Sequence, residues 1–174
     1  MTNVALRGRV ALLAAIVAAG LNAGPARSQS LVDKAQRDEI ARVAEDDPIM
    51  ARAWTRACET LPGFLDVASH PPPGTDGFSV KVAIREGDVA EYFWITPFSR
   101  SGTRFSGRLD NQPRTVHGVA LGQTISFLQT EIVDWMYMDG KRMMGNYTAR
   151  ALLQKASPAE RAEFKQRYGL DADF

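Results

Sequence analysis

Apolar and polar residues are spaced in two different ways along this chain. Up to residue 69 the apolar positions recur at helical spacing, and from residue 78 onward they alternate with polar ones. The stretch 70–77 is rich in proline and glycine and predicts a stiff connector between the two parts. The sequence therefore predicts a helical N-terminal part followed by a β-rich part.

The helical part contains one clear amphipathic stripe. Its apolar positions are Met50, Trp54, Ala57, Cys58 and Leu61. This spacing predicts a helix with one face toward a core. The pair Asp47-Pro48 predicts its start, because aspartate caps helices and proline suits the first helical position. The pair Pro62-Gly63 predicts its end, and a separate peripheral helix is predicted over 31–44.

The β-rich part predicts short strands and then two helices. The expected strands cover 78–84, 90–96, 103–109, 116–120 (a short strand edge), 123–127 and 131–138, with a hairpin turn at 85–88. The expected helices cover 148–155, with Thr148 as its cap, and 157–168, with Ser157 as its cap. This order is typical of an α+β fold. We expect a curved antiparallel sheet or partly closed barrel of five to six short strands, between N-terminal and C-terminal helices.

Residues 1–28 have the three parts of an export signal. Arg7 and Arg9 make the start positive, Val10–Leu21 is an apolar stretch of 12 residues, and Ala26-x-Ser28 fits the small-x-small rule. Twelve apolar residues cover about 18 Å as a helix, short of a hydrocarbon core of roughly 30 Å. We expect a signal peptide cut between Ser28 and Gln29, with an uncleaved anchor as the alternative. The Ala- and Arg-rich composition suggests a bacterium, so the expected location is periplasmic or secreted.

The remaining chain has the size of one domain. We expect a peripheral N-terminal helix in 29–46 and a single α+β domain in 47–174. Without the three arginines of the signal, the 21 basic residues fall to 18 against 20 acidic ones, a net charge of −2. A nearly neutral surface gives no reason to expect nucleic acid as a partner. Stable membrane insertion is not expected after signal cleavage.

Several short motifs in the domain resemble a known family. They are Phe78-x-Val80-Lys81-Val82, Glu91-x-x-Trp94, Phe105-x-Gly107-x-Leu109-x-Asn111-x-Pro113, Gly122, Ile132-x-Asp134-Trp135-Met136-Tyr137 and Gly145-x-x-Thr148-x-Arg150. Their order and spacing resemble the YegJ-like proteins, the domain-of-unknown-function family numbered 2314. The resemblance covers roughly 47–153. It implies a bacterial, often exported domain with no established activity.

The run Asp134-Trp135-Met136-Tyr137 allows two interpretations. On a strand, Asp134 and Met136 face one way while Trp135 and Tyr137 face the other. In the structural interpretation Trp135 fills the core, and Asp134 accepts hydrogen bonds from a turn or an arginine. In the functional interpretation the polar groups of this run form a pocket with the nearby 146–148 segment. The sequence favours the first and leaves the second open.

Lys81 and Glu91 lie on neighbouring predicted strands. We expect them to form a cross-strand ion pair worth under about 1 kcal/mol. The alternative is an acid/base pair in a cleft. A hydrolase with Asp134 or Glu91 as general base would need these two carboxylates to converge, and the sequence does not indicate that they do.

Other reactive groups are scarce. Cys58 lies on the apolar stripe, which predicts a buried, inert thiol. His70 and His117 are isolated, so no metal site of standard spacing is expected. The sequence has no phosphate loop and no dinucleotide fingerprint, and we expect no cofactor.

The sequence therefore favours a non-catalytic periplasmic binding or interaction module, whose partner is an unknown small molecule or protein. A hydrolase using Asp134 or Glu91 is the alternative. The candidate binding residues are Lys81, Glu91, Trp94, Asp134, Trp135, Tyr137, Asn146, Thr148 and Arg150.

Overall fold

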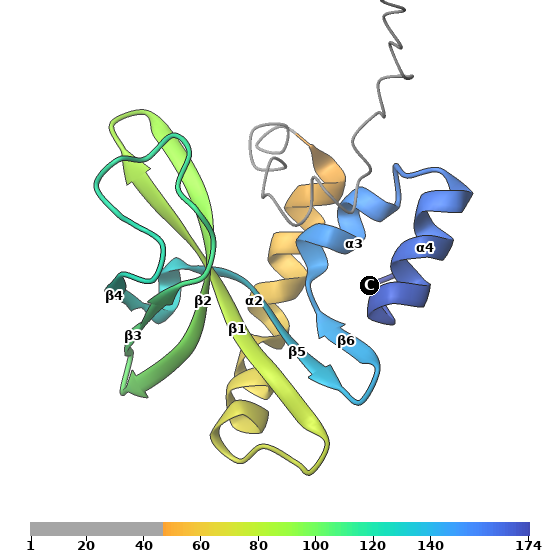
Figure 1. Cartoon of the computed structure of the whole chain (residues 1–174), viewed down its shortest axis with the longest axis horizontal. Coiled ribbons are helices and arrows are strands. Elements are labelled where there is room, and N and C mark those ends of the chain that lie inside the picture. Colours follow the sequence, from red (N-terminus) through yellow and green to blue (C-terminus); the bar gives the residue numbers. More distant parts are fainter. Residues whose placement is uncertain (1–46) are drawn as a thin grey trace, which may run out of the picture.

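The fold is known from a computed structural model, which describes residues 47–174. The export signal and the helix expected over 31–44 lie outside the described residues. Within 47–174 the chain forms a helix, then a six-stranded antiparallel sheet, then two further helices (Figure 1). The predicted α+β order is confirmed, and the sheet is open rather than closed into a barrel.

The sheet has the strand order β4-β3-β2-β1-β5-β6, so β1 lies inside it and β4 and β6 lie at its edges. The strands are β1 (Thr75–Glu86), β2 (Val89–Ser101), β3 (Arg104–Leu109), β4 (Thr124–Leu128), β5 (Ile132–Asp139) and β6 (Arg142–Gly145). The helices are α2 (Pro48–Ser69), α3 (Tyr147–Leu153) and α4 (Pro158–Tyr168), and the 3-10 helix η2 (Gln129–Glu131) joins β4 to β5. In Figure 1, α3 and α4 lie on the β5–β6 side of the molecule, away from β3 and β4.

Helix α2 is longer than predicted. The prediction that Pro62-Gly63 ends it is wrong, because the helix continues through both residues. A proline inside a helix costs about 3 kcal/mol. The continued helix carries Phe64 and Leu65 into the core, where they are 2% and 5% exposed. Burial of two large apolar side chains offsets a cost of that size.

The main core lies between α2 and the sheet. Its members are Leu61, Phe64, Leu65, Val80, Val82, Phe93, Ile95, Phe105, Leu109, Val116, Phe127, Ile132 and Trp135. Two smaller clusters pack α3 against α2 and against α4 with β6. The core thus holds the middle of β1 and the start of β5 firmly against the helices.

Some local predictions hold and others need correction. The hairpin turn after Glu86 and the Ser157 cap of α4 are confirmed. The strand expected at 116–120 is wrong, since these residues belong to a loop, 110–123, that is held to the sheet mainly through side chains. Strand β6 was not predicted, because four residues give too short a pattern. Helix α3 begins one residue before Thr148, which is not its cap.

No helix in the described part of the chain is long and apolar enough to cross a membrane.

Candidate functional site

Three candidate residues form one row across the middle of the sheet. Lys81 of β1 is opposite Trp94 of β2 on one side and opposite Asp134 of β5 on the other. Directly opposed residues share a face of a sheet, so the three side chains are neighbours. The Lys81 ammonium lies 4.5 Å from the centroid of the Trp94 ring, a distance typical of cation–π contacts.

Thr148 joins this row from helix α3. The Lys81 Nζ donates a hydrogen bond to Thr148 Oγ1 at 3.2 Å, and that hydroxyl donates to Asp134 Oδ2 at 2.6 Å. Lys81 is only 7% exposed and Asp134 is 0% exposed. The structure therefore brings Lys81, Asp134 and Thr148 together as one buried polar network, with the half-buried Trp94 ring against Lys81.

Asp134 caps helix α3 from a distant strand. Asn146 occupies the capping position but has a left-handed backbone, with φ of 51°, and makes no side-chain cap bond. The Asp134 carboxylate replaces it and accepts the backbone N–H groups of Tyr147 at 3.1 Å and Thr148 at 2.8 Å. These are the first two N–H groups of the helix, which have no partner inside the helix itself. A carboxylate at this end also interacts favourably with the helix dipole.

Each carboxylate oxygen of Asp134 accepts two hydrogen bonds. Oδ1 accepts the N–H groups of Trp135 and Tyr147, and Oδ2 accepts the N–H and hydroxyl of Thr148. Burial raises the pKa of Asp134, and the Lys81 charge and these hydrogen bonds oppose that rise without cancelling it. A raised carboxyl pKa is common to general bases and to structural networks. Here the four donors leave no lone pair directed at a substrate.

Trp135 and Tyr137 face the opposite side, toward α2. Trp135 is 6% exposed, donates its indole N–H to the carbonyl of Ala57 at 3.1 Å, and stacks on Phe64 at 4.8 Å between ring centroids. Tyr137 stacks on Phe78 at 5.0 Å. The prediction that Trp135 fills the core is confirmed.

Asn146 and Arg150 lie near the network and make other contacts. The Asn146 amide is directed at the sulfur of Met143, 3.2 Å away. Arg150 donates to the carbonyls of Gly145 at 2.7 Å and Met143 at 3.2 Å, and to two carbonyls of the C-terminal segment after α4. Arg150 therefore ties the C-terminal segment to β6.

Glu91 does not pair with Lys81, and that prediction is wrong. Strand register places Glu91 opposite Ile84, three positions along β1 from Lys81. Its carboxylate instead accepts the backbone N–H groups of three consecutive residues, 114–116, at 2.9 to 3.0 Å, together with the Thr115 hydroxyl. Burial alone would raise the pKa of Glu91, but these hydrogen bonds outweigh it and lower the pKa.

The two carboxylates proposed for a hydrolase therefore serve separate segments. Asp134 holds the start of α3, whereas Glu91 holds loop 110–123 against β2. Asn111 adds to the second attachment: its side chain accepts the N–H of Trp94 at 2.8 Å and donates to the carbonyl of Tyr92 at 3.3 Å. In this way the side chain of Asn111 replaces a neighbouring strand where β3 ends.

Cys58 is exposed, so the prediction of a buried thiol is wrong. Its neighbour Ala57 faces the core at 1% exposure. Because successive helix residues are rotated by about 100°, Cys58 lies at the margin of the stripe. Partial burial of the sulfur, and to a lesser extent the charge of Asp134, raise the pKa of the thiol. Within residues 47–174 no group of three or more His, Cys, Asp or Glu side chains is placed to hold a metal ion.

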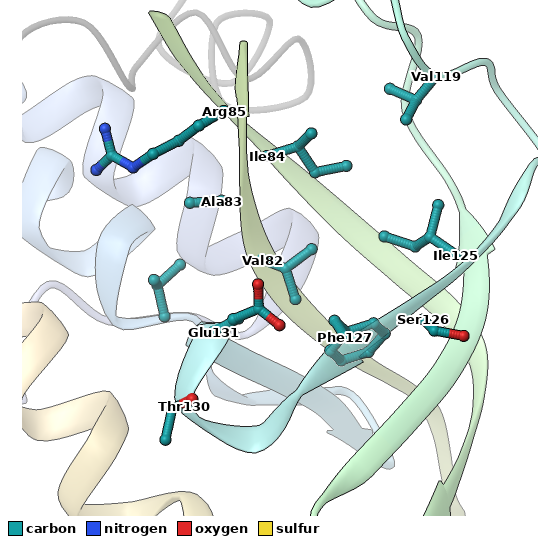
Figure 2. A pocket seen from close by; sticks show the side chains of 11 residues that line it. Val82, Ala83, Ile84, Arg85, Val119, Ile125, Ser126, Phe127, Thr130 and Glu131 are labelled. Carbon is teal, nitrogen blue, oxygen red and sulfur yellow. The ribbon is translucent and has the colours of Figure 1, made fainter. Parts of the chain in front are cut away.

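A hollow of about 580 Å³ lies between β1 and β4, and we call it the β1/β4 hollow. Its lining residues are Val82, Ala83, Ile84, Arg85, Val119, Ile125, Ser126, Phe127, Thr130, Glu131 and Val133. Figure 2 shows Val82 and Ile84 pointing from β1 toward Ile125. None of these residues was a candidate from the sequence. The hollow depends on where β5 starts beside β1, and local patterns carry no signal of strand register between distant segments.

The family model described as "Uncharacterized protein conserved in bacteria (DUF2314)" matches residues 47–172. The chain belongs to the DUF2314 family. The match covers nearly all of the described residues, and it confirms the resemblance seen in the sequence motifs.

Two further proteins are similar in sequence to this DUF2314 protein. The chain is 29% identical over 130 residues to the uncharacterized protein YegJ of Escherichia coli K12, covering 75% of this chain and 84% of YegJ. It is 27% identical over 86 residues to a putative ankyrin repeat protein of Neisseria meningitidis serogroup B, covering 49% of this chain and 34% of that longer protein. No solved structure matches this fold.

Two glycines of the DUF2314 motifs have clear structural reasons. A Cβ at Gly107 would lie 2.4 Å from a methyl group of Ile95. A Cβ at Gly145 would lie 2.2 Å from the carbonyl oxygen of Trp135, and Gly145 has a φ of 71°. Both glycines allow close approach of backbones around the core. These motif positions therefore serve the fold.

Proposed function

We propose that this DUF2314 protein is an exported, non-catalytic interaction module whose binding surface is the β1/β4 hollow. The observation that carries the proposal is a concave, mostly apolar surface between two strands, lined by none of the polar candidates from the sequence. Apolar hollows with a few polar groups at their margin are typical binding surfaces. Arg85, Thr130 and Glu131 provide those polar groups here.

The buried network supports a structural role for most of the sequence candidates. Asp134 accepts four hydrogen bonds, including two from the end of α3, and Lys81 donates to the Thr148 hydroxyl. Buried groups whose donors and acceptors are already hydrogen-bonded stabilise a fold and have no donor or acceptor left for a ligand. No observation in the described residues favours the hydrolase alternative, since Glu91 is likewise occupied by loop 110–123.

The meningococcal relative also supports a role in interaction. Its name describes a putative ankyrin repeat protein, and the similar segment makes up 34% of it. Ankyrin repeats stack into extended concave surfaces that bind other molecules. A segment similar to this chain in such a protein supports a role in interaction.

Site-directed photo-cross-linking in the producing cells tests the proposed surface. A photoreactive residue replaces Thr130, which lines the hollow and is exposed, or Gln166, which is exposed on α4 as a matched control. We expect a discrete adduct in the periplasmic fraction from position 130 and none from position 166. The adduct should disappear when Ile125→Lys is added to the same chain. Equal labelling from both positions, or none from either, would contradict the proposed surface.

Export is tested separately by intact-mass analysis of the periplasmic protein. The proposal expects a chain that starts at Gln29, within a few residues. A full-length chain recovered from the membrane fraction would contradict it.

A further inference from the structure

We propose that the β1/β4 hollow binds one extended polypeptide segment of another protein, which adds a strand between β1 and β4. This inference rests on the proposed function and names the class of partner. It depends on three features of the hollow: the kind of surface that lines it, the strand pairing on its two sides, and its side-chain chemistry.

The first feature is that the hollow lies against strand edges. Its lining includes four consecutive residues of β1, 82–85, and three consecutive residues of β4, 125–127. Successive side chains of a strand point to opposite faces of a sheet. A hollow against one face would therefore touch every second residue, whereas a hollow against an edge touches all of them. The β1/β4 hollow touches consecutive residues of both strands and therefore lies against strand edges.

The second feature is that, within residues 47–174, no strand pairs with β1 or β4 along the edges that border the hollow. The β1–β5 ladder stops at the pair Val82 and Ile132, while the β1–β2 ladder continues to Glu86 and Val89. Helix η2 turns the chain away at this point, so β5 does not extend beside Ala83 and Ile84. Strand β4 is the last strand of the sheet and pairs only with β3. Main-chain groups at such edges form a template for an added strand.

The third feature is the chemistry of the lining. Six side chains are apolar and either β-branched or aromatic: Val82, Ile84, Val119, Ile125, Phe127 and Val133. These residue types pack well against the alternating side chains of a strand. Glu131 directly precedes the residue that pairs with Val82, so it lies at one end of the β1 edge, where its carboxylate also accepts the N–H of Leu128. A segment with alternating apolar residues and a base at one end complements this surface.

The geometry of the hollow also favours a single extended segment of another protein over a second copy of this chain or its own segment 29–46. A hollow with a strand edge on each side accepts a single free strand, whereas a second folded copy would bring the rest of its own sheet. The chain's own segment 29–46 carries eight charged side chains among 18 residues, which suits an apolar hollow poorly. Strands β1 to β4 alternate in direction, so β1 and β4 run oppositely. An added strand must therefore be antiparallel to one of them and parallel to the other.

Synthetic peptides and amide hydrogen exchange test this inference on the full exported chain. The probes are acetyl-Glu-Thr-Val-Thr-Val-Thr-Lys-amide and the peptide of reversed sequence, and the control peptide has serine in place of each valine. We expect at least one probe to bind about tenfold more tightly than the control, because both peptides offer the same main-chain hydrogen bonds and only the valines of the probe pack on the apolar lining. At saturation it should slow exchange at Ala83 or Ile84 and along β4.

Two variants of β4 locate the binding. Ile125→Lys places a charge in the hollow and should weaken probe binding by about tenfold or more. Leu128→Lys lies on the same strand but lines a different hollow near Cys58, and should change binding by less than about twofold. Circular dichroism verifies that each variant is folded, and Val119→Lys replaces Ile125→Lys if that chain unfolds. Probe binding without slowed exchange at β1 and β4, or no preference over the serine peptide, would overturn the inference. If cross-links at position 130 persist in that case, the proposed function stands and only strand addition fails.

Discussion

The two halves of β1 have opposite surroundings. In the first half, Val80 and Lys81 each have a strand partner on both sides, and the side chains around them are buried in the core or in the Asp134 network. In the second half, Ala83 and Ile84 pair with β2 and border the β1/β4 hollow on the other side. One strand therefore passes from a closed region into an open one within three residues.

This difference separates stability from binding. Among the polar candidates from the sequence, Lys81, Asp134 and Thr148 lie at the closed half and hold α3 in place. Glu91 instead lies opposite Ile84 and holds loop 110–123 in place. The open half has few distinctive residues, but it presents main-chain groups and apolar side chains to the outside. Variants in the closed half should therefore lower stability, and variants in the open half should change binding at little cost to the fold.

The largest expected effect is that of Trp135→Ala. It removes a buried aromatic ring that stacks on Phe64 and donates to the Ala57 carbonyl. The free energy of unfolding should fall by about 3–5 kcal/mol. Ser126→Ala, at an exposed position of β4 in the β1/β4 hollow, should change this free energy by less than about 0.5 kcal/mol. Urea unfolding at pH 7 measures both values. Similar losses for the two variants would refute the separation of the stabilising core from the β1/β4 hollow.

Asp134→Asn should have the next largest effect. The amide keeps one acceptor oxygen but turns an NH₂ group toward backbone donors and removes the charge beside Lys81. We expect a loss of about 1–3 kcal/mol, measured as a lower melting temperature. Asp139→Asn, at an exposed position of the same strand, is the matched control and should have almost no effect. An unchanged or higher melting temperature for Asp134→Asn would return Asp134 to the list of candidate binding residues.

Glu91 should make stability depend on pH. Its folded-state pKa lies below the ordinary value of about 4.3, so the ionised form favours the folded state. This stabilisation is complete above that ordinary value and is lost as the pH falls through the lowered folded-state pKa. Glu91→Gln should therefore cost about 1–2 kcal/mol at pH 7 and progressively less toward pH 3. Unfolding of both proteins across this range measures the difference, and a constant difference would contradict the assignment.

Local patterns predict much of this fold and little of its binding surface. The alternation in β1 and β2 and the Ser157 cap each follow from neighbouring residues, and the structure confirms them. The length of α2 does not follow from Pro62, because tertiary burial of Phe64 outweighs a local signal. The roles of Asp134 and Glu91 depend on segments 13 to 25 residues away, so sequence could select these residues but not their partners. The β1/β4 hollow depends on where one ladder ends, which no local pattern specifies.

Residue-resolved hydrogen exchange of the free protein tests the open edge of β1 most directly. In an antiparallel ladder, successive residues direct their N–H groups alternately to one neighbour and to the other. Both amides of Val80 and Lys81 should be protected to near the level of global unfolding, since a strand lies on each side. Of Ala83 and Ile84, one amide should be protected by β2, and the other should exchange about a hundredfold or more faster. Equal protection of all four amides would mean that the edge is already covered, and it would contradict the central claim.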